Sequence, residues 1–396
     1  MAQYSVKRIL EYVRIKDILH FFLCIIVFPF AIVAKIFIRD FWLVCEDKNE
    51  ARDNGYWFFK YVRENKPRQK IAYAINKNSP DYKKVKALGK VVSYGTVSHW
   101  FWYIVADKNI SSQKGGKPNA AVCYFFEVVL KLRRHNRIFL QHGVTVSDAK
   151  WLYYRNCYFD KFICAAKPEY DYIKSRFGYS EKNLALTGFS RFDNLAEVAV
   201  DDNLILIMPS WRDWLGGIES AGEEKIAFTD SEYFKKWNSF INSPILSQLL
   251  SENGKRAVFY PHRNMQKFVS AFKTDCPQIT IADWHDYDVQ DLLKRAALLI
   301  TDYSSVFFDF AYMCKPIIFY QFDEAEFRKK QYQQGYFDYH NTPLGKFVSD
   351  ETLLLAEVKH EVENGIKRTN AKTIKEIFVY KDNKNSERIY DVIKTK

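Results

Sequence analysis

The sequence has no cysteine pattern typical of a metal site or a set of disulfides. Its seven cysteines are an odd number, and no two stand at C-x-x-C spacing, so buried free thiols in a reducing cytoplasm are the simplest interpretation. The motifs G-x-G-x-x-G, G-x-x-x-x-G-K-[ST], G-x-S-x-G and H-E-x-x-H are also absent. Their absence argues against dinucleotide-binding proteins, P-loop proteins, serine hydrolases and zinc proteases. Glycine (15) and proline (11) are too few for a collagenous or low-complexity chain.

The composition is that of a folded, basic protein. The chain has 396 residues, 48% of them hydrophobic, 17% aromatic and 27% charged, which indicates a globular protein of two to three domains. Lysine and arginine (59) exceed aspartate and glutamate (47), which gives a net charge of +12. Such an excess favours an anionic partner: a membrane surface, a nucleic acid or a phosphorylated substrate. The basic residues are dispersed, which argues against nucleic acid.

A long apolar run lies near the N-terminus, at residues 18–38. Its length suits a membrane span, for which about 20 residues are needed, but Pro29 and Lys35 interrupt it. Basic residues flank it on both sides, so the positive-inside rule favours a re-entrant or interfacial hairpin bent at Pro29 on the cytoplasmic face. A straight span and a buried core helix remain open. Phe41 and Trp42 are expected in the lipid headgroup layer.

The rest of the chain alternates short apolar runs with helical patterns, which predicts parallel α/β sheets. Helices are expected at 167–178, 288–295 and 305–315, and a charged helical tail begins near residue 353. The pattern restarts near residue 200, so two α/β domains of similar size are expected. The predicted strands are 71–75, 91–96, 137–143, 159–166, 184–188, 204–210, 256–262, 278–283, 297–301 and 316–320.

Polar clusters follow four of these strands, where open α/β sheets bind their ligands. In Gln141–Gly143, an exposed His142 could act as a base near neutral pH; a histidine that merely caps a turn is the alternative. In Ser210–Asp213, Arg212 could hold a phosphate in bidentate fashion; a surface ion pair is the alternative.

The other two clusters also suit anions. His262 and Arg263 adjoin each other after a strand, although a solvated turn would look the same. Residues Thr301–Ser305 open a helix with hydroxyls and a carboxylate, which suits phosphate at a helix N-terminus. Ordinary N-capping needs only one such residue.

Taken in order, these segments resemble the CDP-glycerol glycerophosphotransferase family. The resemblance covers roughly residues 120–345 and rests on HG, GFSRFDNL, ILIMPSWRDW, YPHR and LLITDYSSVFFDFAYMCKPIIFY, followed by FDEAEFRKKQYQQGYFDY. It implies a GT-B architecture, with two Rossmann-like domains facing a cleft. The expected division is a membrane-associating segment at 1–45, an acceptor domain at 46–199, a CDP-donor domain at 200–375 and a helical tail at 376–396.

The resemblance also implies roles for individual residues. His142 would deprotonate the acceptor hydroxyl, and His262 would lie near the donor pyrophosphate. No metal site and no required cofactor are expected, although Asp302 is compatible with a divalent cation. Residues expected to bind the donor phosphates or nucleotide are Ser210, Arg212, Arg263, Thr301, Asp302, Ser304 and Ser305. Further site candidates are Gly143, Arg191, Asp193 and Asp309.

The reaction implied is transfer of glycerol phosphate or ribitol phosphate from a CDP-polyol to a hydroxyl of a lipid-linked teichoic acid or capsular polymer, with release of CMP. The enzyme would work at the cytoplasmic face of the membrane, peripherally or as a monotopic protein. Val144 and Ser190 stand where the family often has threonine and proline, which leaves the acceptor and the polyol open. The alternatives are a GT-B glycosyltransferase that uses a nucleotide sugar and a non-enzymatic membrane-anchored scaffold.

Overall fold

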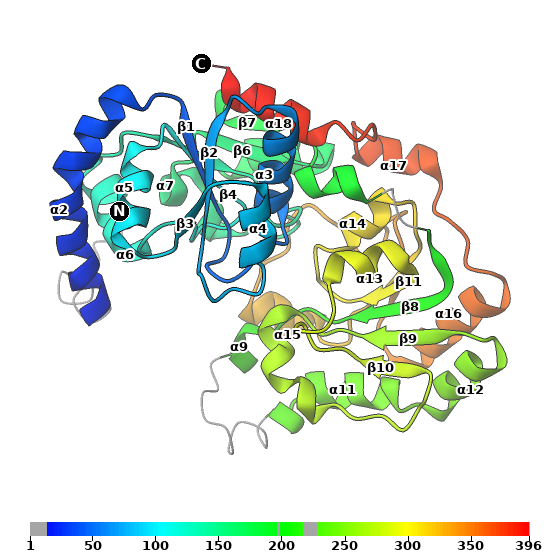
Figure 1. Cartoon of the computed structure of the whole chain (residues 1–396). Helices are drawn as coiled ribbons and strands as arrows, with labels where there is room; N and C mark the ends of the chain where they lie inside the picture. Colours follow the sequence, from blue (N-terminus) through cyan, green and yellow to red (C-terminus); the bar gives the residue numbers. More distant parts are fainter. Residues whose placement is uncertain (1–13, 196–198, 217–227, 396) are drawn as a thin grey trace.

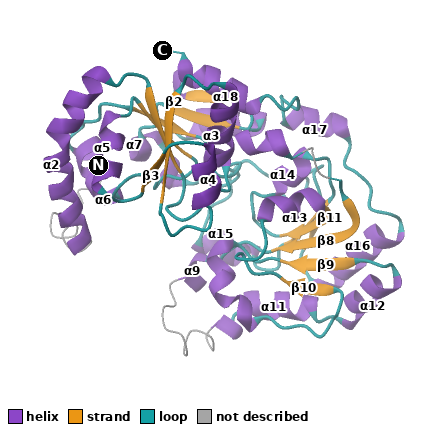
Figure 2. Cartoon of the chain, in the orientation of Figure 1, coloured by secondary structure: helices purple, strands orange, loops and turns teal. Residues whose placement is uncertain are grey.

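Two parallel sheets organise the chain in a computed structural model, which describes residues 14–195, 199–216 and 228–395. The first sheet has the strand order β3-β2-β1-β4-β5-β6-β7 and the second β10-β9-β8-β11-β12-β13. Every pairing between described strands is parallel, and helices cover the sheets, as Figure 2 shows. The predicted architecture of two Rossmann-like α/β domains is confirmed.

The strands are short and mostly buried, as covered parallel sheets require. Those of the first sheet are β1 (Phe41–Cys45), β2 (Lys70–Ile75), β3 (Val91–Ser93), β4 (Lys108–Ser111), β5 (Asn136–Phe139), β6 (Lys161–Cys164) and β7 (Leu184–Leu186). Those of the second sheet are β8 (Asp201–Met208), β9 (Arg256–Phe259), β10 (Ile279–Ile281), β11 (Ala296–Thr301), β12 (Ile317–Tyr320) and β13 (Lys346–Val348).

The helices connect and cover these strands (Figure 1). In the N-terminal half they are α2 (Ile15–Phe37), α3 (Asn54–Asn65), α4 (Tyr82–Leu88), α5 (Val97–Val105), α6 (Ala120–Tyr124), α7 (Tyr154–Cys157) and α8 (Lys167–Arg176). Those that follow are α9 (Asp213–Gly216), α11 (Glu232–Ile241), α12 (Pro244–Glu252), α13 (Val289–Arg295), α14 (Phe307–Tyr312), α15 (Glu324–Lys330), α16 (Glu351–Glu363), α17 (Ala371–Ile377) and α18 (Asn385–Lys394).

Strand β1 corrects the expectation that Phe41 and Trp42 lie among lipid headgroups. Both residues are buried, and β1 pairs with β2 on one side and β4 on the other. The aromatic and branched side chains of FWLVC favour a strand in such a doubly covered position. The Trp42 ring packs against Tyr390 of α18, with centroids 5.3 Å apart. The C-terminal helix therefore returns to the N-terminal domain, as Figure 1 shows.

The apolar run forms α2, one continuous helix with Pro29 inside it, so the expected hairpin is wrong. It packs along α5, with Cys24, Val27 and Ala31 buried. Lys35 fixes its end, because its Nζ donates to Ala106 O at 2.6 Å and pairs with Asp107 at 3.2 Å. The helix continues through Pro29 although the proline has no N–H to donate. The opposite face of α2 stays exposed.

Each sheet reverses its strand order at one point, and ligands bind beyond the strand ends at such points. The reversal lies between β1 and β4 in the first sheet and between β8 and β11 in the second. The segments after β8 and β11 contain Ser210–Asp213 and Thr301–Ser305, two of the four predicted polar clusters. The fold thus places these clusters beside the expected ligand position.

Candidate active site

The loop after β5 touches the loop after β11, so the predicted clusters of the two domains meet. Gly143 lies against Ser305, and any side chain at position 143 would collide with the Ser305 Oγ. The preceding residue, Gln141, has a left-handed backbone with φ of 57°. Its carbonyl accepts a hydrogen bond from Asn54 Nδ2 at 2.7 Å. The chain is thereby turned so that His142 enters the space between the domains.

His142 has the exposure and the neighbour of a general base. Its side chain is 58% exposed, and its Nδ1 lies 3.9 Å from Asp53 Oδ2. That carboxylate oxygen is buried and has no hydrogen-bond partner among the described residues. The contact is longer than a hydrogen bond, but a negative charge on this side of the ring favours a proton on Nδ1, which leaves Nε2 free to accept another. The arrangement suits proton abstraction from a hydroxyl.

Asp53 was not predicted, and it comes from the turn between β1 and α3. It precedes the first residue of α3, while the neighbouring Glu46 accepts hydrogen bonds from the N–H groups of Arg52 (3.1 Å) and Tyr56 (2.6 Å). Burial, together with the charge of Asp53, raises the pKa of Glu46 to about 8. The sequence signal for Asp53 is the segment Asp-Asn-Gly, which follows the apolar run FWLVC. The expectation that FWLVC belongs to the membrane-associating segment conceals this signal.

Arg191 connects the two domains at this point. Its Nη1 donates to Asp53 Oδ1 and to the His142 carbonyl, both at 2.8 Å. Its Nε and Nη2 donate to the two oxygens of Asp309 on α14, at 2.5 and 2.8 Å. Although burial opposes the charge, Asp309 and Asp53 raise the pKa of Arg191. The predicted site residues Arg191 and Asp309 therefore form one ion pair across the domain boundary.

Arg212 and Asp302, expected at the donor phosphates, are fully buried. Arg212 Nη2 lies 2.9 Å from Asp302 Oδ2, and its Nε lies 2.7 Å from Asp323 Oδ2. Ser210 N donates to Asp302 Oδ1 at 2.8 Å, and the buried Thr301 hydroxyl donates to the carbonyl of Met208. These four predicted residues form a buried network of hydrogen bonds and ion pairs that holds together the segments after β8 and β11. Ser304 and Ser305, which follow this network in the chain, are partly exposed.

His262 follows β9 and is held as a neutral imidazole. Its Nδ1 accepts a hydrogen bond from Asn264 N at 3.2 Å, so the ring proton lies on Nε2. Burial, then the charges of His142 and Arg263, lower the pKa of His262 to about 3. The next residue, Arg263, contacts Glu50, so His262 lies on the side of its domain that faces the N-terminal domain. His262 therefore offers an N–H donor to an anionic ligand.

Arg263 supplies an accessible positive charge beside His262. Its Nε donates to Glu50 of the N-terminal domain at 2.8 Å. Its guanidinium lies 3.4 Å from the ring centroid of Trp284, which follows β10. Both contacts lie at the exposed surface, so a diphosphate can compete for the guanidinium.

Asp193 lies apart from this group. Its carboxylate accepts hydrogen bonds from the N–H groups of Asn385 and Ser386, both at 2.8 Å, and so caps α18. Within the described residues, no cluster of three or more histidine, cysteine or acidic side chains is placed to hold a metal ion. All seven cysteines are free thiols, and six of them are buried, as predicted.

Two doubly wound parallel sheets, each with one reversal of strand order, define a GT-B-type architecture. Comparison of the sequence is more specific: residues 35–395 match the sequence model of the CDP-Glycerol:Poly(glycerophosphate) glycerophosphotransferase family. The chain belongs to this family of transferases, which confirms the predicted resemblance.

Known relatives agree with this assignment. The chain is 31% identical to the minor teichoic acid biosynthesis protein GgaB of Bacillus subtilis (strain 168) over 89% of its own length and 39% of that protein's. It is 25% identical to a teichoic acid glycerol-phosphate transferase of Staphylococcus aureus (strain NCTC 8325 / PS 47) over 56% of this chain and 57% of the relative. The chain thus spans less than two thirds of these curated relatives.

Solved structures share the fold. The wall teichoic acid polymerase TagF superposes with a TM-score of 0.64 at 18% identity, covering 89% of this chain and 88% of that one. The S. aureus MnaA–UDP complex gives a TM-score of 0.56 at 11% identity, covering 90% and 96%. These likenesses support the GT-B fold.

Proposed function

We propose that this protein transfers a polyol phosphate from a CDP-polyol, CDP-glycerol or CDP-ribitol, to a hydroxyl of a teichoic acid acceptor and releases CMP. The observation that carries the proposal is that His142 and His262 stand on loops that contact the opposite domain in a member of this family. Family membership supports the chemistry, and one solved form of TagF, which was soaked with CDPG, supports the class of donor.

The proposed mechanism uses the two histidines differently. His142 Nε2 takes the proton of the acceptor hydroxyl while Asp53 holds its Nδ1–H. The acceptor oxygen then bonds to the phosphorus that carries the polyol, and the bond from that phosphorus to the bridging oxygen of CMP breaks. His262 Nε2–H and Arg263 stabilise the negative charge on the departing CMP. Phosphoryl transfer needs this positioning and charge compensation more than covalent catalysis.

We expect no essential cofactor. Both oxygens of Asp302 already contact Arg212 or backbone N–H groups, so this carboxylate has little capacity left for a divalent cation. Turnover that persists after EDTA treatment and desalting would agree with this proposal; loss that Mg²⁺ restores would contradict it.

We also place the reaction at the cytoplasmic membrane surface, with a lipid-linked polymer as the acceptor. Helix α2 is long and apolar enough to cross a membrane by length and composition, yet only 17% of its most apolar window is buried. Its docking along α5 supports a monotopic helix lying in the interface.

The test is release of CMP from each CDP-polyol in the presence of a lipid-linked acceptor. His142→Ala and His262→Ala should each lower turnover by roughly 10²- to 10⁴-fold, the usual contribution of acid–base groups. His360→Ala, at an exposed position of α16, is the matched control. Phosphorus NMR should show a new phosphodiester; a glycosidic product without one would instead establish a glycosyltransferase.

A further inference from the structure

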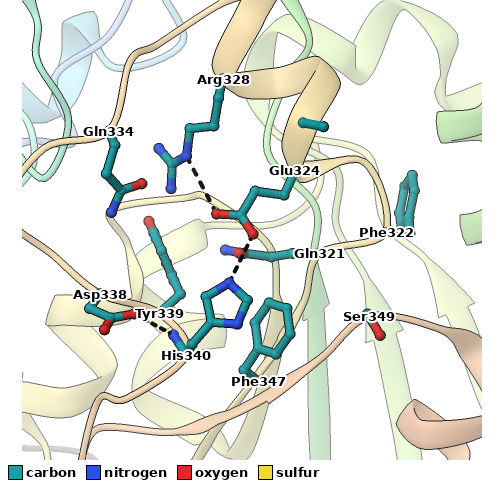
Figure 3. Close-up of a pocket in the computed structure, with 11 residues that line it drawn as sticks. Gln321, Phe322, Glu324, Arg328, Gln334, Asp338, Tyr339, His340, Phe347 and Ser349 are labelled. Atoms are coloured by element: carbon teal, nitrogen blue, oxygen red, sulfur yellow. Dashed lines mark hydrogen bonds and ion pairs between the residues drawn. The ribbon is translucent and has the colours of Figure 1, made fainter.

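A cavity lies in the C-terminal domain, near the carboxyl ends of β12 and β13. Its volume is about 860 Å³, and its walls include Gln321, Glu324, Arg328, Tyr339, His340 and Phe347. Figure 3 shows these side chains converging from α15, from the residue after β12, from the segment between α15 and β13, and from β13 itself. None of them belongs to the active site described above.

Buried polar atoms beside this cavity lack partners among the described residues. They are Gln321 Oε1 and the Nε and Nη2 atoms of Arg328. Gln321 is only 2% exposed, and its Nε2 donates to the carbonyl of Asp302 at 2.9 Å, which fixes the amide. Arg328 Nε is 3.6 Å from Glu324 Oε1, beyond hydrogen-bond distance. Because unpaired buried polar groups are destabilising, the cavity suits a ligand that both donates and accepts hydrogen bonds.

The charges and rings of the cavity favour an uncharged ligand. Glu324 and Asp338 contribute two carboxylates against the single guanidinium of Arg328. Glu324 also contacts His340 Nε2 at 2.9 Å, and the His340 ring lies 3.8 Å from that of Phe347. The carboxylate oxygens repel a phosphate but accept hydrogen bonds from hydroxyl groups. The aromatic rings can pack against the C–H groups of a ligand.

The cavity adjoins the loop after β11, because Gln321 in its wall donates to the Asp302 carbonyl. Strands β12 and β13 lie one and two places from β11, which is about 5–10 Å at the usual strand spacing. The segment that carries Gln334 into the cavity also reaches the N-terminal domain, where Asp148 N donates to the Gln333 carbonyl at 3.3 Å. The cavity therefore lies beside the predicted donor loop, and one segment that lines it reaches the N-terminal domain.

We infer that this cavity binds an uncharged polyhydroxy unit, a polyol or sugar of the acceptor polymer, beside the transfer site. The hydroxyls would donate to Gln321 and Glu324 and accept from Arg328, and the carbon skeleton would lie against Phe347. The acceptor part of this inference rests on the proposed function; the ligand class does not.

Saturation-transfer NMR on the full chain, with glycerol, ribitol and glucose as probes, tests the ligand class. At least one probe should receive saturation from the wild type, and the signal should fall at least fivefold in Glu324→Gln and in Phe347→Leu. Glu326→Gln is the control, because Glu326 lies on the same helix but pairs with the exposed Lys330. Unchanged thermal unfolding shows that the variants are folded.

Absence of saturation transfer to all three probes would overturn the inference. Equal transfer in the wild type and both cavity variants would also overturn it, as would displacement of the probes by inorganic phosphate. In the CMP-release assay, the two variants should raise KM for the acceptor about tenfold and leave KM for the CDP-polyol unchanged. If the wild type releases no CMP, the proposed function fails, and the NMR result still decides the ligand class.

Discussion

At the scale of single residues, the two contacts of Asp53 assign it a specific role, which is to position His142. Asp53 contacts Arg191 with one oxygen and faces His142 with the other. Asp53→Asn keeps the shape but removes the charge that holds the imidazole. We expect kcat to fall roughly 10- to 100-fold, part of what a general base contributes, with KM for both substrates unchanged.

The values of kcat and KM are also measured for the Asp53→Glu and Asp47→Asn variants. The glutamate variant should recover part of the loss, and Asp47, exposed on the same loop, should be insensitive to substitution. A rise in KM with unchanged kcat would show that Asp53 binds substrate and does not position the base.

The low pKa of His262 leads to a prediction about the dependence of the reaction on pH. With a pKa of about 3, His262 is neutral from pH 5 to pH 8 in the free protein, so its titration adds no acid limb to the dependence of kcat/KM on pH. His262→Asn, which is neutral at every pH, should lower the profile and leave its shape unchanged. Disappearance of an acid limb in this variant would show that His262 titrates in the working range.

Residue chemistry in the sequence predicted several residues that the structure brings together, but not the surroundings of each one. An arginine after a buried strand can face the ligand or the interior, and only the convergence of Asp302 and Asp323, distant in sequence, turns Arg212 inward. His142 and Ser305 follow strands and adjoin glycine or a helix start, so local patterns sufficed for them.

At the scale of elements, substitutions in α2 test the membrane proposal separately from the catalytic proposal. Phe22, Ile26 and Phe30 lie on one face, each more than half exposed. Because burying a large apolar side chain contributes about 1.5–3 kcal/mol, replacing all three with glutamine should reduce binding to anionic vesicles at least tenfold. CMP release with a soluble acceptor should not change.

Vesicle flotation is the measurement for α2. Leu353→Gln, an exposed apolar position on α16, is the control and should bind as the wild type does. Undiminished flotation of the triple variant would show that another surface attaches the protein.

Three strands were not predicted, for two reasons: two are short or polar, and the third lies next to the apolar N-terminal run. Strand β4 reads KNIS, and its polar side chains are tolerated because partners such as the Tyr103 carbonyl, which accepts from Asn109, are brought there by the fold. Strand β13 has three residues, and β1 adjoins an apolar run that looks like part of it. The long apolar strands β8 and β11 were evident from their composition.

At the scale of the whole molecule, Arg191 connects the two domains through buried charges. Arg191→Met would leave Asp309, only 1% exposed, without its partner. Breaking a buried pair in this way costs about 3–5 kcal/mol, so we expect a clear drop in Tm by calorimetry and a larger radius of gyration in solution scattering.

The exposed pair of Lys330 with Glu326 provides the comparison. Lys330→Met should change the stability by less than about 1 kcal/mol. Equal effects of the two substitutions would mean that the contact between the domains does not depend on Arg191.

The stacking of Arg263 on Trp284 gives the protein an optical reporter of its own. Indole emission responds to a cation 3.4 Å from the ring centroid, and a diphosphate that draws the guanidinium away would change that emission. Addition of CDP should therefore alter the intrinsic fluorescence, and Trp284→Phe should abolish most of the change. Donor affinity could then be titrated without a label and without turnover.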